Sequence, residues 1–152
     1  MIKLFRGVWD SFLSPMLQRP KRLQVAALCY RDEGDDRQVL LVTSRDTGRW
    51  IIPKGWPIRG LSSPESARQE AWEEAGVSEG QMAAKSIGTY TYDKTLSSGL
   101  PVAVETLVYS FEVENLKEDF PESRERRRKW VSPSDAAGLV REHELKSIFR
   151  AL

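Results

Sequence analysis

Three glutamates in the middle of the chain have the spacing needed for metal-dependent phosphate chemistry. Glu70, Glu73 and Glu74 lie in the segment PESARQEAWEEAGV. A helix turns about 100° per residue, so the three side chains would fall within an arc of about 100°. Carboxylates crowded on one face repel one another unless cations join them. Mg²⁺ and Mn²⁺ take oxygen ligands and often bridge to substrate phosphates, so these residues are candidate metal ligands and catalytic groups.

The neighbouring residues predict a helix over residues 64–75 that packs on a sheet. Ser62 or Ser63 is expected to cap it, because a side-chain oxygen there accepts from the first free backbone N–H groups. Small side chains let the helix lie close to its neighbour, and they line the face beside the glutamates at Ala67, Ala71 and Ala75. The simpler explanation of an isolated Glu-x-x-Glu-Glu pattern is a solvated acidic face, since surface helices are commonly charged.

The wider segment, residues 53–77, resembles the Nudix box. That pattern is Gly, five residues, Glu, seven residues, Arg-Glu, an aliphatic residue, any residue, Glu-Glu, any residue, Gly and an aliphatic residue. Counted from Gly55 without gaps, five pattern positions are matched: Glu70, Glu73, Glu74, Gly76 and Val77. The resemblance implies an α/β fold, a Nudix-type α/β/α sandwich with a mixed β-sheet. It also implies a Mg²⁺- or Mn²⁺-dependent pyrophosphohydrolase that cleaves a phosphoanhydride bond of a diphosphate linked to another group.

Two box positions depart from the pattern. Leu61 stands in place of the first Glu, which in the family supports the metal site, and Gln69 in place of the Arg, which holds the carboxylates. Gln69 can reach Glu73 one turn on, but it brings no positive charge, and Arg68 points about 160° away from Glu70 on a helix. The intact glutamates favour an active enzyme. The alternative is a Nudix-like module that binds a nucleotide or polyphosphate and cleaves it weakly or not at all.

Residues 26–55 and the later RRRKWVSPSDAAGLV resemble the diphosphoinositol polyphosphate and diadenosine polyphosphate hydrolases. This branch implies a small, highly acidic substrate and a basic rim, and guanidinium groups bind phosphate oxygens in a two-pronged way. The predicted substrate-binding residues are Arg22, Arg45, Lys54, Gly55 and Arg128. A solvated surface position is the alternative for each arginine. Glu105 and Glu118 are both open as the general base, and Trp56 is the candidate aromatic contact.

The rest of the chain predicts one sandwich domain over residues 21–152. Strands are expected at 24–30, 38–43, 49–53, 87–92 and 102–113, and helices at 134–140 and 142–152. Residues 1–20 form a separate segment with an amphipathic helix over 2–17, which docks on the domain or pairs two subunits as a homodimer. A membrane-surface role for this helix has less support.

Composition excludes several classes of protein. The 152 residues are 40% hydrophobic and 30% charged, as in a folded domain. Twenty-three Lys and Arg against 22 Asp and Glu give a net charge of +1, which disfavours a nucleic-acid partner. No apolar run approaches the roughly 20 residues that span a bilayer. One cysteine, Cys29, and no visible signal peptide favour a cytoplasmic protein.

Overall fold

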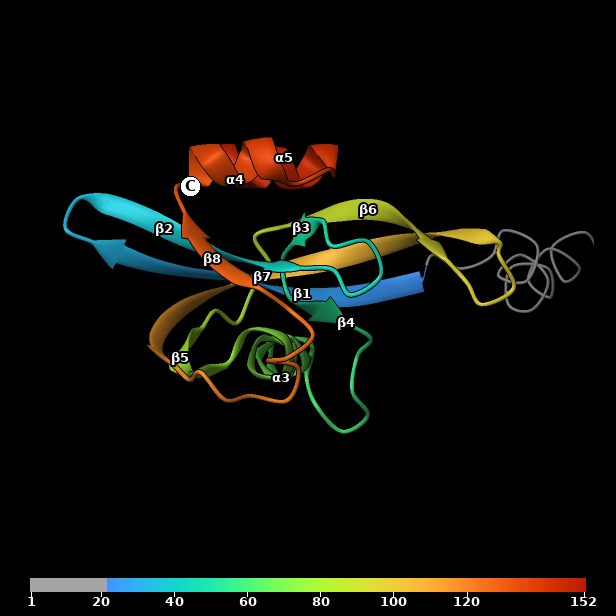
Figure 1. Ribbon diagram of the computed structural model, residues 1–152, viewed down its shortest axis with the longest axis horizontal. Coiled ribbons are helices and arrows are strands. Elements are labelled where there is room, and N and C mark those ends of the chain that lie inside the picture. Colours follow the sequence, from blue (N-terminus) through green and yellow to red (C-terminus); the bar gives the residue numbers. More distant parts are fainter. Residues whose placement is uncertain (1–21) are drawn as a thin grey trace, which may run out of the picture.

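The computed structural model describes residues 22–152 (Figure 1). The predicted helix over residues 2–17 lies outside them, so the separate N-terminal segment stays a prediction. The elements follow the order β1 (Arg22–Glu33), β2 (Asp36–Thr43), β3 (Trp50–Ile51), β4 (Lys54–Gly55), α3 (Ser63–Ala75), β5 (Val77–Met82), β6 (Gly88–Thr95), β7 (Pro101–Leu116), β8 (Arg128–Val131), α4 (Pro133–Leu139) and α5 (His143–Arg150).

A mixed sheet runs through the centre of the described domain. Its main path is β3-β2-β1-β7-β5, and β4, β6 and β8 pair with β1, β7 and β2. The long strands β1 and β7 run parallel, whereas the other pairs are antiparallel. Because side chains alternate along a strand, β1 and β7 each contribute one set of residues to either face.

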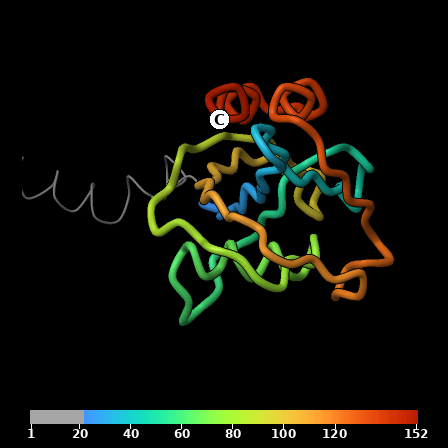
Figure 2. Tube along the Cα trace, turned by 90° about the vertical axis from the view of Figure 1, so that its left-hand side faces the viewer, coloured from blue at the N-terminus to red at the C-terminus, as the bar shows by residue number. Residues whose placement is uncertain are grey.

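Helices cover both faces of this sheet. The paired helices α4 and α5 lie on one face and α3 lies on the other (Figures 1 and 2). Under α4 and α5 the sheet buries an apolar cluster that includes Leu28, Leu41, Val108, Leu145 and Phe149. Under α3 it buries a second cluster that includes Val25, Val42, Phe111 and the three helix alanines Ala67, Ala71 and Ala75. This arrangement confirms the predicted α/β/α sandwich.

The helix that carries the glutamates begins and ends as its sequence dictates. Ser62 is the N-cap: its Oγ accepts from Glu65 N at 3.3 Å, and Ser62 N donates to Glu65 Oε1 at 3.4 Å. Gly76 ends the helix with φ of +74°, in the left-handed region that favours glycine. A Cβ at Gly76 would stand 2.6 Å from Lys117 O, so the close approach of this loop also requires glycine.

Three short strands have no counterpart among the predicted strand ranges. The strand β4 is only two residues long and lies in a Gly/Pro-rich loop, where no periodicity can show it. The strand β5 has the polar sequence VSEGQM and is held by pairing with β7 rather than by an apolar pattern. The strand β8 lies at the end of a basic run and pairs with β2. Each of these segments forms a strand because it pairs with a neighbouring strand, and not because of its local sequence pattern.

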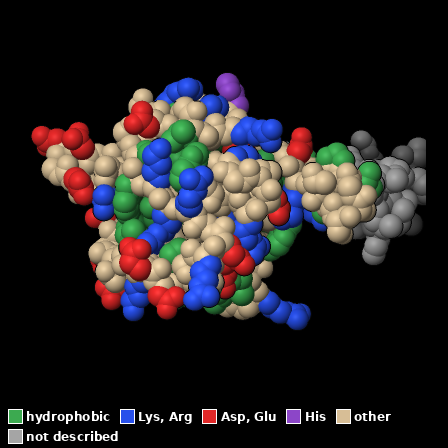
Figure 3. All heavy atoms as spheres, viewed as in Figure 1, with side chains coloured by type: hydrophobic (Ala, Val, Ile, Leu, Met, Phe, Trp, Pro, Cys, Tyr) green, Lys and Arg blue, Asp and Glu red, His purple; other side chains and the backbone are tan. Residues whose placement is uncertain are grey.

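The cysteine and two of the tryptophans belong to the packed interior or its edge. Cys29 is fully buried, and burial raises the pKa of its thiol. Trp50 and Trp130 are half-buried and pack against the two apolar clusters. Within residues 22–152, no helix is long and apolar enough to cross a membrane. Basic and acidic side chains lie interspersed on the face shown in Figure 3.

Candidate active site

The acidic face of α3 lies against β4. Residues Lys54 and Gly55 pair with Ala26 and Val25 of β1, which fixes this short strand next to the helix. A Cβ added at Gly55 would stand 2.3 Å from Glu70 Oε1 and 2.4 Å from its Cδ. Only glycine therefore lets the Glu70 carboxylate lie directly on the backbone of β4.

Glu74 is the most buried of the three glutamates, with 6% of its surface exposed. Its Oε2 accepts from Lys54 N at 3.0 Å, and its Oε1 accepts from Arg126 Nη2 at 3.0 Å. Burial raises the pKa of the Glu74 carboxyl to about 7, although the Arg126 charge and the Lys54 N–H bond oppose the rise. Both oxygens of Glu74 are thus held by donors from outside the helix.

Glu70 is in a different electrostatic position. Burial raises the pKa of its carboxyl to about 8, and the nearby Glu74, Glu73 and Glu122 raise it further than Arg126 lowers it. No residue of the described domain donates a hydrogen bond to the Glu70 carboxylate in the way that Lys54 and Arg126 do to Glu74. Ionisation of Glu70 would therefore add a negative charge to the site that Arg126 offsets only in part.

Two further carboxylates complete the cluster. Gln69 Nε2 donates to Glu73 Oε1 at 3.3 Å, which confirms the contact predicted from helix spacing. Glu122, in the loop after β7, donates its backbone N–H to Glu73 O at 3.0 Å and pairs with Arg126 at 3.0 Å. Sequence reasoning missed Glu122 as a member of the site. Its only sequence signal is the four-residue spacing from Arg126.

This donor set fits a hard divalent cation. Carboxylate oxygens are the preferred ligands of Mg²⁺ and Mn²⁺, and a cation bound beside Glu70 would favour the ionised carboxylate that burial and the neighbouring glutamates now disfavour. Among the described residues, no three acidic side chains already converge on one metal position. Glu73 and Glu74 instead face Gln69, Lys54 and Arg126. Glu70, Glu73 and Glu74 stay the predicted ligands.

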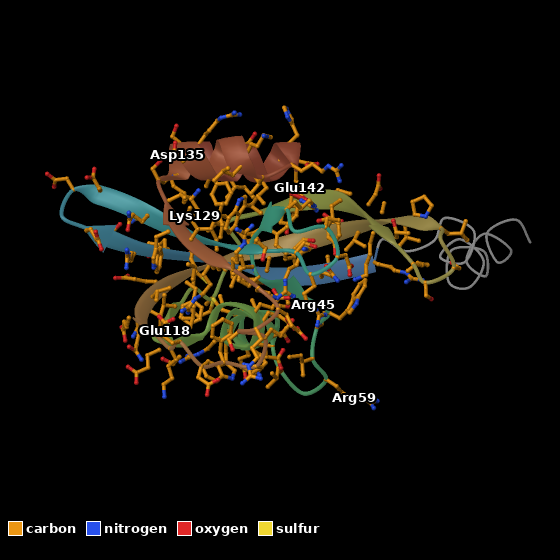
Figure 4. The ribbon with its side chains drawn as sticks, in the orientation of Figure 1. Arg45, Arg59, Glu118, Lys129, Asp135 and Glu142 are labelled. Atoms are coloured by element: carbon orange, nitrogen blue, oxygen red, sulfur yellow. The ribbon has the colours of Figure 1, made fainter. Side chains whose placement is uncertain are left out.

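Of the predicted basic residues, Arg45 and Lys54 lie nearest the glutamates. Arg45 is exposed and pairs with Glu122 at 3.3 Å and Glu125 at 3.2 Å, between the sheet and the loop after β4 (Figure 4). Lys54 contributes its backbone N–H to the site, while its Nζ lies 4.9 Å over the Tyr92 ring. Burial lowers the pKa of the Lys54 ammonium to about 8.

The other two predicted arginines lie apart from this cluster. Arg22 is exposed at the start of β1, opposite Val104 of β7. Arg128 Nη1 donates to Ala75 O and Lys117 O, both at 2.9 Å, so its guanidinium closes the C-terminal end of α3. The structure does not bring Arg22 or Arg128 into contact with the glutamates. A substrate role for each stays a prediction.

The two candidate bases and Trp56 differ in their surroundings. Glu118 is 97% exposed and pairs with Arg128 at 3.2 Å, on the side of the domain near β5 (Figure 4). Glu105 is half-buried on β7, opposite Leu23 of β1. Trp56 is 40% exposed, and Lys94 Nζ lies 5.6 Å from its ring.

Comparison with known proteins decides the family. A model of the NUDIX domain matches residues 20–151 of the chain. The chain belongs to the NUDIX family. Human diphosphoinositol polyphosphate phosphohydrolase 3-beta is 31% identical over 123 residues, which are 80% of this chain and 70% of that protein. The prediction of a Nudix pyrophosphohydrolase of this branch is therefore confirmed.

Solved structures of Nudix proteins share the fold. An Ap4A hydrolase from C. elegans superposes with a TM-score of 0.59 at 22% identity, over 86% of this chain and 95% of that one. A NUDIX hydrolase from Nitrosomonas europaea gives a TM-score of 0.60 at 21% identity, over 86% of this chain and 87% of that one. At this identity the likeness concerns the fold alone. It agrees with the mixed sheet and its two helical layers.

Proposed function

We propose that this Nudix hydrolase cleaves a phosphoanhydride bond of a small polyphosphorylated molecule, a diphosphoinositol polyphosphate or a diadenosine polyphosphate, with Mg²⁺ or Mn²⁺ as its cofactor. The observation that carries the proposal is the half-buried Glu70 side chain, which packs on Gly55 beside other carboxylates and accepts no hydrogen bond from the described residues. The likeness to a diphosphoinositol polyphosphate phosphohydrolase supports the substrate class.

The proposed roles follow from the contacts of each residue. A bound divalent cation would lower the pKa of a water ligand and neutralise charge on phosphate oxygens. Glu70, Glu73 and Glu74 would hold the cation, and Lys54 N and Arg126 fix the carboxylate of Glu74. The Gly55 backbone has no side chain to keep the carboxylate of Glu70 at a distance.

Basic groups at the edge of the site would meet the charge of the substrate. Arg45 is the strongest candidate, because its exposed guanidinium already lies against the carboxylates of Glu122 and Glu125. Arg–carboxylate pairs at a surface contribute little, so substrate phosphates can take over this guanidinium at small cost. The ammonium of Lys54 and the guanidinium groups of Arg22 and Arg128 complete the proposed substrate-binding set.

A binding module without strong turnover is the second candidate. The observation that favours it is the exchange of two box positions, Leu61 and Gln69, and the side chain of Leu61 is 39% exposed and has no group that binds a cation. In that case the site would bind the same polyphosphates and leave them intact.

Product release over a small panel, with Mg²⁺ or Mn²⁺, distinguishes the two candidates. The panel holds diadenosine hexaphosphate, a diphosphoinositol polyphosphate, ADP-ribose and a nucleoside triphosphate. The test variant is Glu74→Gln, and the matched control is Glu144→Gln, which removes an exposed carboxylate at the start of α5. Turnover of either of the first two compounds that is lost only in Glu74→Gln supports the proposal. Tight binding without turnover supports the binding module.

A further inference from the structure

The proposed metal-binding helix, α3, contributes no basic residue of its own to its acidic face. Arg68 is the one basic residue between Ser63 and Ala75, and its guanidinium lies 5.6 Å over the ring of Phe111. Gln69 reaches Glu73 with a neutral amide. Like charges at neighbouring helix positions destabilise the helix and splay the side chains apart. A positive charge must therefore come from another part of the chain if the carboxylates are to be held in place.

Arg126 supplies that charge from the loop before β8. Its side chain is 5% exposed, although arginine is almost never buried unless it is paired. Its Nη2 donates to Glu74 Oε1 and to Glu122 Oε1, both at 3.0 Å. Its Nη1 donates to Thr43 O at 2.9 Å. One guanidinium thus joins the helix, the loop and the end of β2.

The loop that carries Arg126 is itself fixed at both sides. Arg127 N donates to Thr43 Oγ1 at 2.9 Å, and Thr43 N donates to Arg127 O at 3.1 Å, so the backbone next to Arg126 is tied to β2. Glu122 N donates to Glu73 O at 3.0 Å, which ties the start of the loop to α3. The guanidinium is therefore preorganised by backbone contacts, as expected of a group that must orient metal ligands.

We infer that Arg126 is the positioning residue of the metal site: its guanidinium holds the carboxylates of Glu74 and Glu122 in place, a task for which α3 provides no cation of its own. The inference rests on the proposed function for the identity of the metal ligands. Arg126 does not touch substrate in this assignment. Its removal should therefore weaken metal binding and lower turnover, with the KM for the substrate unchanged at saturating Mn²⁺.

The test compares Mn²⁺ affinity, measured by isothermal titration calorimetry without substrate, in two backgrounds. Arg126→Gln should bind Mn²⁺ about 10- to 100-fold more weakly, the range typical of outer partners of metal ligands. The control Arg127→Gln makes the same charge change at an exposed neighbour and should leave the affinity within two-fold. The Gln69→Arg background adds a guanidinium one turn before Glu73. In this background, Arg126→Gln should weaken Mn²⁺ binding by less than about three-fold.

Three results would overturn the inference. The first is unchanged or tighter Mn²⁺ binding by Arg126→Gln, because the guanidinium would then merely compete with the cation. The second is an equal loss of affinity in both backgrounds. The third is a raised KM with normal Mn²⁺ affinity, which would make Arg126 a substrate contact.

Two controls keep the result interpretable. If Arg126→Gln does not fold by circular dichroism, Arg126→Lys replaces it, since it keeps the charge and loses the two-pronged contact. The inference is supported if Arg126→Lys binds Mn²⁺ more weakly than wild type and if this loss is smaller in the Gln69→Arg background. Wild-type Mn²⁺ affinity of Arg126→Lys overturns the inference. If the wild-type protein binds Mn²⁺ with an affinity that depends on Arg126 but cleaves no compound of the panel, the hydrolase is refuted and the inference stands. A wild-type protein that binds no Mn²⁺ refutes both.

Discussion

The substitution Gly55→Ala tests the site with the smallest possible change. Gly55 does not have a positive φ, so alanine suits its backbone. The added Cβ would, however, stand 2.3 Å from Glu70 Oε1, 2.4 Å from Cδ and 2.8 Å from Oε2. Ordinary contact begins at 3.4 Å, so the Glu70 carboxylate must move by about 1 Å. The atoms that must yield are the end of a flexible side chain, so the fold should survive.

Metal binding and catalysis should be far more sensitive to this movement than stability. A displacement of about 1 Å in a catalytic arrangement can cost about 100-fold in rate, and disturbed support of a metal ligand about 10- to 100-fold in affinity. We expect Gly55→Ala to lower kcat/KM about 100-fold and Mn²⁺ affinity at least about 10-fold. The melting temperature should fall by no more than a few degrees.

The control for this variant is Gly138→Ala in α4. Gly138 is exposed in a helix, and a Cβ there meets no atom within 4 Å. Alanine is favoured over glycine in a helix by about 0.5–1 kcal/mol, so the control should be slightly stabilised and fully active. The assays are calorimetric titration with Mn²⁺, steady-state hydrolysis and thermal unfolding. A folded Gly55→Ala protein with wild-type Mn²⁺ affinity would falsify the role given to the contact between Gly55 and Glu70.

Three further predictions follow from single contacts. Without metal, the free energy of unfolding should fall as pH rises from about 4.5 to about 8, because the folded-state pKa values of Glu70 and Glu74 are raised from 4.5 to about 8 and about 7, and below 4.5 both states are protonated. Glu70→Gln should flatten this slope in urea titrations, and an unchanged slope would contradict the assignment. Gly76→Ala should destabilise by at least about 1 kcal/mol, since it combines a left-handed φ with a 2.6 Å approach to Lys117 O, and an unshifted melting curve would refute this. Arg128→Gln should lower the melting temperature, because it removes donors from Ala75 O and Lys117 O, whereas normal melting with a raised KM would assign the guanidinium to substrate.

Local sequence rules predicted the helix and its acidic face because the decisive contacts are close in sequence. Ser62 caps α3 through Glu65, three residues on, and Gln69 reaches Glu73, four residues on. The alanine face of the helix is fully buried, as expected of small residues at helical spacing. The long apolar strands β1, β2 and β7 also follow directly from their patterns.

The remaining parts of the site depend on contacts between distant segments. Glu74 and Arg126 are separated by 52 positions, and Arg45 and Glu125 by 80. No periodicity relates such residues, and the run that contains Arg126 has the composition of an ordinary solvated segment. Arg128 is a predicted substrate-binding residue, but its guanidinium donates to the backbone carbonyls of Ala75 at the end of α3 and Lys117 in the loop.

The two exchanged box positions therefore have different consequences. Gln69 lacks the positive charge of the usual Arg, but the fold supplies one from another segment. Arg126 Nη2, in the loop before β8, donates to Glu74 Oε1 at 3.0 Å. The carboxylate missing at Leu61 has no such counterpart at that position, since Leu61 is an exposed apolar residue. Glu122, however, adds a carboxylate to the cluster from the same loop as Arg126. The effect of a departure from the Nudix box thus depends on the charged groups that the fold brings to the site. Because Arg126 and Glu122 lie there, the hypothesis of an active hydrolase has more support than the box alone gives it.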